Sequence, residues 1–167
     1  MRLSVLTTSL LLVDILSSVT GRPKDSVAQL ICRDVVKPCG DGWSRIDEKR
    51  CAKYFTTPKA FKDADAHCKA SGSELVSAHN DDQLRRVVCI TILADSERKP
   101  FWIGAKRSGE GFVYTDGSKV DYSQWFPGQP DNFSGQEDCV EVNHKKWGLW
   151  NDDDCSDEIN FMCAKNM

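Results

Sequence analysis

The chain has 167 residues, about the length of one ordinary domain, and 40% of them are hydrophobic, which is enough for a packed core. Its formal net charge is −3, and no basic patch interleaves with aromatic residues. These properties exclude a typical nucleic-acid-binding domain.

The first 21 residues, MRLSVLTTSLLLVDILSSVTG, combine a basic residue, a mostly apolar run and small residues before Arg22. This order is typical of a secretory signal peptide, and the run is too short to span a membrane and is interrupted by Asp14. No later run is long or apolar enough to cross a bilayer. We therefore expect a soluble, secreted, extracellular protein without membrane insertion.

All eight cysteines follow this segment, at positions 32, 39, 51, 68, 89, 139, 155 and 163. In an exported chain they predict a disulfide framework, and their even number leaves no obligatory free thiol. A zinc site would need closely spaced Cys-x-x-Cys pairs, and the sequence has none.

The region before the second cysteine, residues 22–38, is predicted to be a short N-terminal leader. Its stretch AQLICRDVVK has room for about two helical turns. Residues 42–55 combine aromatic residues with alternating polarity and predict a β-hairpin.

A helix is expected to follow this hairpin. Thr57 can cap it, Pro58 suits its first turn and Gly72 can end it. Its buried face is expected to hold three residues: Phe61, Ala64 and Cys68.

A second helix is predicted from Asn80 to about Ala94, because Asn80 and Gln83 resemble a capping box. Its buried side is expected to consist of Leu84, Val87, Val88 and Ile92.

After Pro100 the sequence changes from helical patterns to short strand patterns. FWIGAK predicts a strand, and FVYTDGSKVDY predicts a hairpin around Asp116 and Gly117. Residues 123–138 predict a long loop, and CVEVN, KWGLWN and INFMCAK predict closing strands. The order of these elements indicates an α+β domain with two helices and short antiparallel sheets.

The long loop begins a strongly acidic part of the chain. Residues 129–158 contain nine acids and two lysines. Such crowding of like charges favours binding of a local cation.

Six motifs, CGDGW, FWIGA, QPD, EDC, WND and FMCAK, occur in the order and spacing of a C-type lectin-like domain, from about Cys39 to Lys165. The chain resembles this family, and most of all the small secreted galactose- or lactose-binding lectins of fish mucus and venom. The resemblance implies a disulfide-stapled α+β domain over residues 39–167 with a long calcium- and sugar-binding loop. It implies three disulfide pairs: Cys39–Cys51, Cys68–Cys163 and Cys139–Cys155.

By the same resemblance, five residues form a calcium site that also binds sugar: Gln129, Asp131, Glu137, Asn151 and Asp152. Calcium accepts about 6–8 oxygen ligands. Three carboxylates and two amides supply most of them and leave room for two sugar hydroxyls. The family also implies a cis peptide bond before Pro130.

The Gln-Pro-Asp order within this loop implies a preference for galactose-type sugars, whereas Glu-Pro-Asn goes with mannose-type sugars. Phe133 has two interpretations: it stacks against the apolar face of galactose, or it packs under Pro130. Asn132 begins the sequon NFS and is a possible glycosylation site. An auxiliary calcium site of some members is expected to be absent, because its acids are replaced by Ala105, Lys106 and Arg107.

The tryptophans and histidines, which often take part in binding or catalysis, are not expected to do so here. The five tryptophans are predicted to be core residues: Trp43, Trp102, Trp125, Trp147 and Trp150. The three histidines are predicted to lie at the surface and to form neither a metal pair nor a catalytic triad: His67, His79 and His144. We therefore expect no enzymatic activity.

Two cysteines, Cys32 and Cys89, lie outside the pairs that the resemblance implies. They can bond to each other, which would tie the leader to the second helix. In the alternative that the sequence slightly favours, Cys32 links two chains into a disulfide-linked homodimer and Cys89 is a buried thiol. Two linked sugar sites can raise avidity by about 10²–10⁴.

The sequence as a whole predicts a secreted, calcium-dependent lectin for galactose-terminated glycans, acting in glycan recognition or innate defence. One alternative is a lectin-like fold without sugar binding, with ice or a protein as its ligand. Another is a lectin that binds sugar without calcium. A calcium-dependent hydrolase would need a water-activating base beyond the metal ligands, and none is evident.

Overall fold

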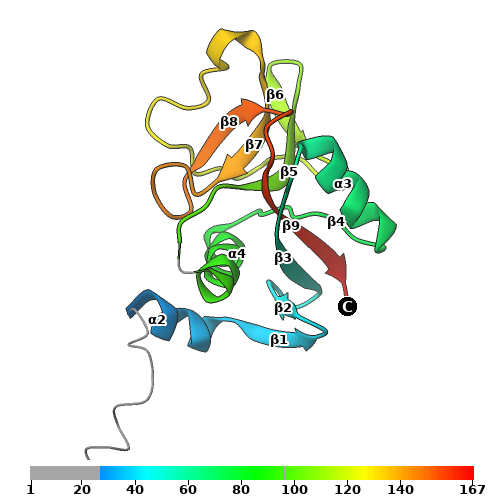
Figure 1. Ribbon diagram of the computed structural model, residues 1–167, viewed down its shortest axis with the longest axis vertical. Helices are drawn as coiled ribbons and strands as arrows, with labels where there is room; N and C mark the ends of the chain where they lie inside the picture. The colour runs from blue at the N-terminus through cyan, green and yellow to red at the C-terminus, as the bar shows by residue number, and fades with distance from the viewer. Residues whose placement is uncertain (1–26, 96) are drawn as a thin grey trace, which may run out of the picture.

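The computed structural model describes residues 27–95 and 97–167, in which three helices pack around one mixed β-sheet (Figure 1). The predicted α+β class is confirmed. The predicted signal peptide and residues 22–26 lie outside the described residues. Within the described residues, none of the helices has the length and apolar character needed to cross a membrane.

The leader residues that the structure describes pack onto the body of the protein. Helix α2 (Val27–Val35) lies against helix α4 (Asp81–Ala94), as Figure 1 shows. The chain then enters strand β1 (Lys37–Gly40). The division between leader and domain at residue 39 stays a prediction.

Cys32, on α2, is bonded to Cys89, on α4, and both are buried. The favoured hypothesis of an interchain bond through Cys32 is therefore wrong for this structure, and so is the buried thiol at Cys89. The physical reason is the docking of α2 on α4, which brings the two Cα atoms to 5.0 Å. That separation is normal for a disulfide. A sequence does not reveal such packing between helices distant in the chain.

Strands β1, β2 (Trp43–Arg45) and β3 (Arg50–Lys59) form an antiparallel ribbon, which confirms the first predicted hairpin. However, β3 runs through Thr57 and Pro58, where a helix was predicted to begin. Pairing with strand β9 (Ile159–Asn166) extends β3 to Lys59, with an irregularity after Phe55 that tolerates the missing N–H of proline. Sheet pairing thus overrides the local helix signal.

The helix itself, α3 (Phe61–Ala70), begins after an N-cap residue, Ala60, that makes no side-chain capping bond. Its predicted buried face is confirmed: Phe61, Ala64 and Cys68. Gly72 follows the helix with a φ of +68° and donates its N–H to the carbonyl of Lys69.

Helix α4 agrees with its prediction at both ends. Asn80 Oδ1 accepts from the Gln83 N–H at 2.9 Å, while Gln83 Oε1 accepts from the His79 N–H at 2.8 Å. The predicted buried residues are buried: Leu84, Val87, Val88 and Ile92.

The remaining strands are β4 (Glu74–Leu75), β5 (Phe101–Ser108), β6 (Gly111–Tyr114), β7 (Glu137–Val142) and β8 (Trp150–Asp154). The sheet order is β1-β2-β3-β9-β5-β7-β8, with β4 on β9 and β6 on β5. The β5–β9 pair is parallel, so the expected separate antiparallel sheets are corrected to one mixed sheet.

The ends of some predicted strands differ from the structure. After β6, the turn at Gly117 is present, but its second strand is reduced to one bridge between Val113 and Lys119. Within the segment KWGLWN, which was predicted to be a strand, the observed strand β8 begins only at Trp150. Three tryptophans are buried as predicted and Trp125 packs against the core, but Trp147 is 37% exposed.

The structure contains the three disulfides that the resemblance implies. Cys39–Cys51 staples β1 to β3, and Cys68–Cys163 ties α3 to β9. Cys139–Cys155 joins β7 to the residue after β8. This last bond fixes the two strands that carry most of the acidic residues of the segment 129–158.

We expect the wild-type protein to run as a monomer without reductant, with Cys32 and Cys89 in one linked peptide on mass spectrometry. Replacing both with serine removes a crosslink between residues 57 positions apart. The chain-entropy model gives about 4 kcal/mol for its loss, measurable by denaturant unfolding. A dimer that collapses on reduction would contradict this pairing.

Candidate metal centre

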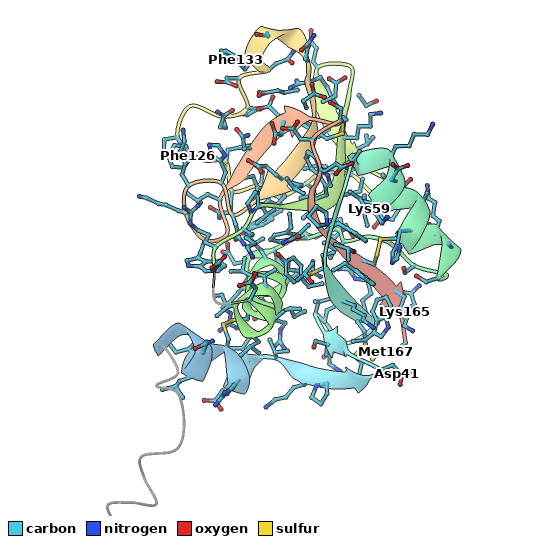
Figure 2. All side chains as sticks on the ribbon, viewed as in Figure 1. Asp41, Lys59, Phe126, Phe133, Lys165 and Met167 are labelled. Carbon is cyan, nitrogen blue, oxygen red and sulfur yellow. A yellow bond between two sulfur atoms is a disulfide. The ribbon has the colours of Figure 1, made fainter. Side chains whose placement is uncertain are left out.

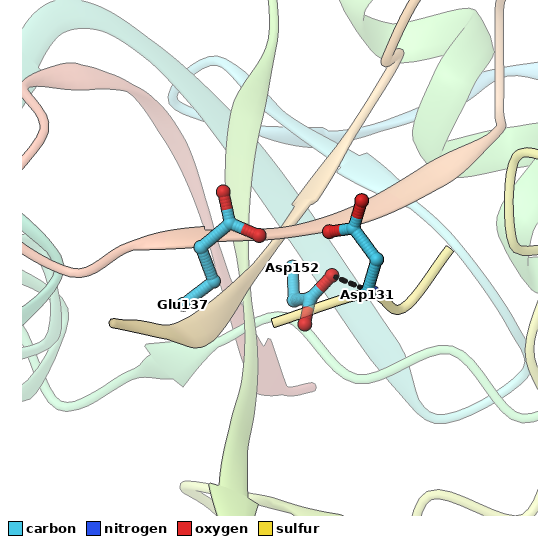
Figure 3. Close-up of side chains that lie close together, drawn as sticks. All are labelled: Asp131, Glu137 and Asp152. Atoms are coloured by element: carbon cyan, nitrogen blue, oxygen red, sulfur yellow. Dashed lines mark hydrogen bonds between the residues drawn. The ribbon is translucent and has the colours of Figure 1, made fainter. Parts of the chain in front are cut away.

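Three carboxylates converge where the long loop meets strands β7 and β8. Asp131 lies in the loop, Glu137 begins β7 and Asp152 lies within β8. Their ligand oxygens all lie within 4.8 Å of one another. Figure 3 shows the carboxylates of Glu137 and Asp131 turned toward each other, with Asp152 close to both. Three of the five residues implied by the family resemblance are therefore brought together.

Asp152 joins the loop to the sheet. Its side chain is 0% exposed, yet its oxygens accept from backbone N–H groups of the loop. Oδ1 accepts from Asp131 at 3.0 Å, and Oδ2 accepts from Asn132 at 2.9 Å. Since a buried carboxylate without partners is strongly unfavourable, these bonds make the loop position and the burial of Asp152 depend on each other.

The loop also closes on itself around Glu137. Glu137 Oε2 accepts from the Phe133 N–H at 2.9 Å, and Asn132 Oδ1 accepts from the Glu137 N–H at 3.1 Å. Gln129 Oε1 accepts from the Asp131 N–H at 3.0 Å, so the amide of Gln129 lies beside Asp131. The Gln129–Pro130 peptide bond is cis, as the resemblance implies.

Phe133 stands at the apex of this loop and is 71% exposed (Figure 2). Its side chain therefore does not pack under Pro130, the second interpretation that the sequence allowed. Glycosylation of Asn132 stays a prediction. The amide oxygen of this residue accepts a hydrogen bond from the Glu137 N–H.

Asn151 is buried in β8, and only the nitrogen of its side-chain amide is hydrogen-bonded within the described residues. Its Nδ2 donates to Glu141 Oε1 at 3.1 Å, while its Oδ1 has no hydrogen-bond partner among the described residues. A residue only 6% exposed rarely leaves such an acceptor unpaired. An oxygen held free in this way fits a metal ligand.

Glu141 is a residue of this site that sequence reasoning missed. It lies opposite Asn151 in the β7–β8 pair, is buried, and also accepts from His144 Nδ1 at 2.8 Å. His144 is thus half-buried and engaged rather than a plain surface residue. The cross-strand register, closed by Cys139–Cys155, is the signal that could have revealed this contact.

Three acidic side chains in and around the site have a raised pKa. Burial raises the pKa of Glu137, and the nearby charges of Asp152 and Asp131 raise it further. Burial also raises the pKa of Glu141, and burial with the charge of Glu141 raises the pKa of Asp153 to about 6. A bound cation would relieve this repulsion, and carboxylate and amide oxygens are the ligands of a hard cation such as calcium. The residues present therefore fit a calcium ion.

A second polar cluster lies near α4, away from these carboxylates in the chain. His79 Nδ1 is 2.8 Å from Asp121 Oδ1, and His79 Nε2 is 3.4 Å from Ser118 Oγ. The sequence did not predict this triad-like grouping. However, the Ser118 hydroxyl donates to Asp116 at 2.5 Å, so it is engaged elsewhere rather than activated by His79.

Comparison with known proteins identifies the family. A family model described as Lectin C-type domain matches residues 57–165, well over half of the chain. The chain belongs to the C-type lectin family. It is 45% identical over 129 residues to C-type isolectin Sp-CL4 from Scorpaena plumieri, which covers 77% of this chain and 90% of that lectin. It is 31% identical to the galactose-specific lectin nattectin from Thalassophryne nattereri, over 82% of this chain and 86% of nattectin.

Solved structures agree with this C-type lectin fold. CEL-I from Cucumaria echinata superposes with a TM-score of 0.70 at 32% identity, covering 77% of this chain and 97% of that chain. Herring type II antifreeze protein superposes with a TM-score of 0.69 at 26% identity, covering 77% and 99%. The lectin relatives and the C-type lectin fold are typical of non-enzymatic carbohydrate-binding proteins.

The contact between Glu141 and Asn151 predicts a role in metal affinity. Replacing Glu141 with alanine frees the Asn151 amide to rotate, so we expect calcium affinity to fall by about 10–100-fold in calorimetric titration. Glu141→Gln keeps an acceptor oxygen and should retain most of the affinity. An alanine variant that binds calcium like the wild type would contradict this role.

Proposed function

We propose that this C-type lectin is secreted and binds galactose-type sugars through a calcium ion held by Gln129, Asp131, Glu137, Asn151 and Asp152. The observation that carries the proposal is the convergence of three carboxylates beside the buried Asn151, directly before Asp152 in β8, whose amide oxygen has no hydrogen-bond partner in the described part of the chain. This donor set suits a hard divalent cation. Galactose-terminated glycans outside the cell would be the partners.

The protein's own side chains would orient the sugar. Calcium, when bound, supplies coordination for two neighbouring sugar hydroxyls. Each hydroxyl can also donate to a carboxylate and accept from an amide N–H, so the placement of acids and amides selects the sugar. Gln129 and Asp131 put the amide first and the acid second, which is the order implied for galactose-type sugars.

The exposed ring of Phe133 supports a preference for galactose. It stands beside the carboxylates, because the backbone N–H of Phe133 donates to Glu137. An exposed ring in this place is free to cover the apolar face of a sugar, and a large exposed aromatic residue otherwise has an unfavourable surface. Nattectin, similar over most of this chain, is described as galactose-specific.

Ice binding is a second candidate function, because herring type II antifreeze protein has the same fold at 26% identity. The lectins Sp-CL4 and nattectin, at 45% and 31% identity, favour sugar binding over this alternative. A protein that inhibits ice growth and is not retained on immobilised sugar would favour ice binding over sugar binding.

The experiment is chromatography on immobilised lactose and immobilised mannose, with millimolar calcium or with chelator. Extracellular calcium modules bind with dissociation constants of about 10⁻⁴–10⁻³ M, so millimolar calcium should be required. The wild-type protein should be retained on lactose in calcium and released by chelator. Equal retention in chelator would contradict a calcium-dependent site.

The matched variant exchanges the amide and the acid, Gln129→Glu with Asp131→Asn, which keeps the number of oxygen ligands and the charge. It should lose retention on lactose and gain retention on mannose. If it still elutes from lactose like the wild type, selectivity lies elsewhere, and Phe133→Ala becomes the next variant to test.

A further inference from the structure

The guanidinium of Arg107 places a positive charge beside the carboxylate cluster. It lies on β5, and its Nη2 donates to Asp152 Oδ2 at 2.6 Å. The same nitrogen donates to the Glu137 carbonyl oxygen at 3.0 Å, and Nε lies 3.2 Å from Asp138 Oδ1. The side chain is only 20% exposed. One guanidinium therefore connects β5 to both strands that carry the proposed metal ligands.

This position is supported by packing as well as by charge. Phe112 lies opposite Arg107 in the β5–β6 pair, and the guanidinium lies 4.7 Å from the centre of its ring. Phe112 in turn contacts Trp125, with ring centres 5.2 Å apart. The neighbouring Lys106 is exposed. Arg107 is thus held in place between an aromatic ring and Asp152.

We propose that Arg107 is a built-in cation that stabilises the calcium-free form of this site and competes electrostatically with calcium for Asp152. The proposal rests on the calcium site proposed above. Arg107 keeps the loop attached to β8 when calcium is absent and lowers the affinity of the site for calcium. It is a positioning residue, acting through Asp152 and the Glu137 backbone.

The calcium-free part of the proposal follows from the burial of Asp152. Its side chain is fully buried beside two other carboxylates, and besides Arg107 it accepts from two backbone N–H groups. Removing one partner of a buried ion pair leaves an uncompensated charge, which is strongly unfavourable. The loop residues that donate to Asp152 should then lose their anchor.

The competition follows from Coulomb's law. Arg107 lies 2.6 Å from Asp152 Oδ2, and a calcium ion at the proposed site would be held by the same carboxylate. At a separation on the order of 5 Å, the +1 charge of Arg107 and the +2 charge of calcium would repel each other even at the dielectric constant of water. This repulsion corresponds to about a tenfold loss of calcium affinity. The repulsion is larger where water is excluded.

The consequence for the lectin is a loop whose order does not depend entirely on calcium. The protein would remain folded and protease-resistant when calcium is scarce, while the sugar site would fill only near millimolar calcium. Sugar binding could then be switched by calcium concentration without unfolding the loop.

The test compares the full-length wild type with Arg107→Met, which keeps an apolar side chain against Phe112. Lys106→Met is the matched control, because it removes the same charge from the adjacent exposed position. Calcium affinity is measured by calorimetric titration, and melting temperature is measured in chelator and in saturating calcium. Arg107→Lys, which keeps a charge, is a second variant in case Arg107→Met does not fold.

We expect Arg107→Met to bind calcium about tenfold more tightly than the wild type and to melt at least about 5 °C lower in chelator, with a smaller change in calcium. Lys106→Met should match the wild type, and Arg107→Lys should bind calcium more weakly than Arg107→Met. A wild type that binds calcium together with an Arg107→Met variant that binds it no more tightly would overturn only the role of Arg107. A wild type that binds no calcium would overturn the proposed function and the competition with it.

Discussion

The site depends on the hydrogen bonds and the ion pair that the buried carboxylate of Asp152 makes. This carboxylate sits in a central part of β8 without exposure to solvent, and its hydrogen bonds run to the loop at Asp131 and Asn132 and to Arg107 on β5. A charge in such a place requires partners on every side. The loop, the sheet and the internal cation therefore form one unit, in which moving any part exposes or unpairs Asp152.

Around this carboxylate the protein arranges two kinds of support. Glu141 accepts a hydrogen bond from the amide of Asn151, whose oxygen has no partner within residues 27–95 and 97–167, and Arg107 forms an ion pair with Asp152. The disulfide Cys139–Cys155 holds β7 to β8, so the register that sets these contacts is covalently secured. Two of the proposed metal ligands, Asn151 and Asp152, are thus contacted by residues that do not themselves belong to the proposed ligand set.

The sequence predicted what is local or carried by a motif. The capping pair Asn80 and Gln83, the buried face of α3 and the acidic loop motifs are readable because their residues are close together in the chain. The start of α3 was predicted wrongly, since pairing of β3 with β9 extends a strand over Thr57 and Pro58. The parallel contact between β5 and β9 was equally hidden, because it joins segments far apart in the sequence.

The bond between Cys32 and Cys89 and the contacts of Arg107 and Glu141 show the same limit. Each joins two elements whose relative placement is decided by tertiary packing, and no local pattern marks the partner. Arg107 was recognised only as a residue that excludes an auxiliary calcium site. In the structure it is paired with Asp152, at the proposed calcium site.

The central claim is that one calcium ion and one galactose-type sugar share the site built on Asp152. Calorimetric titration with calcium, in the absence and presence of saturating lactose, tests this claim most directly. If the two ligands share the site, lactose must raise calcium affinity by the same factor by which calcium raises lactose affinity, whereas mannose should change neither. A calcium affinity that is identical with and without lactose would contradict the account.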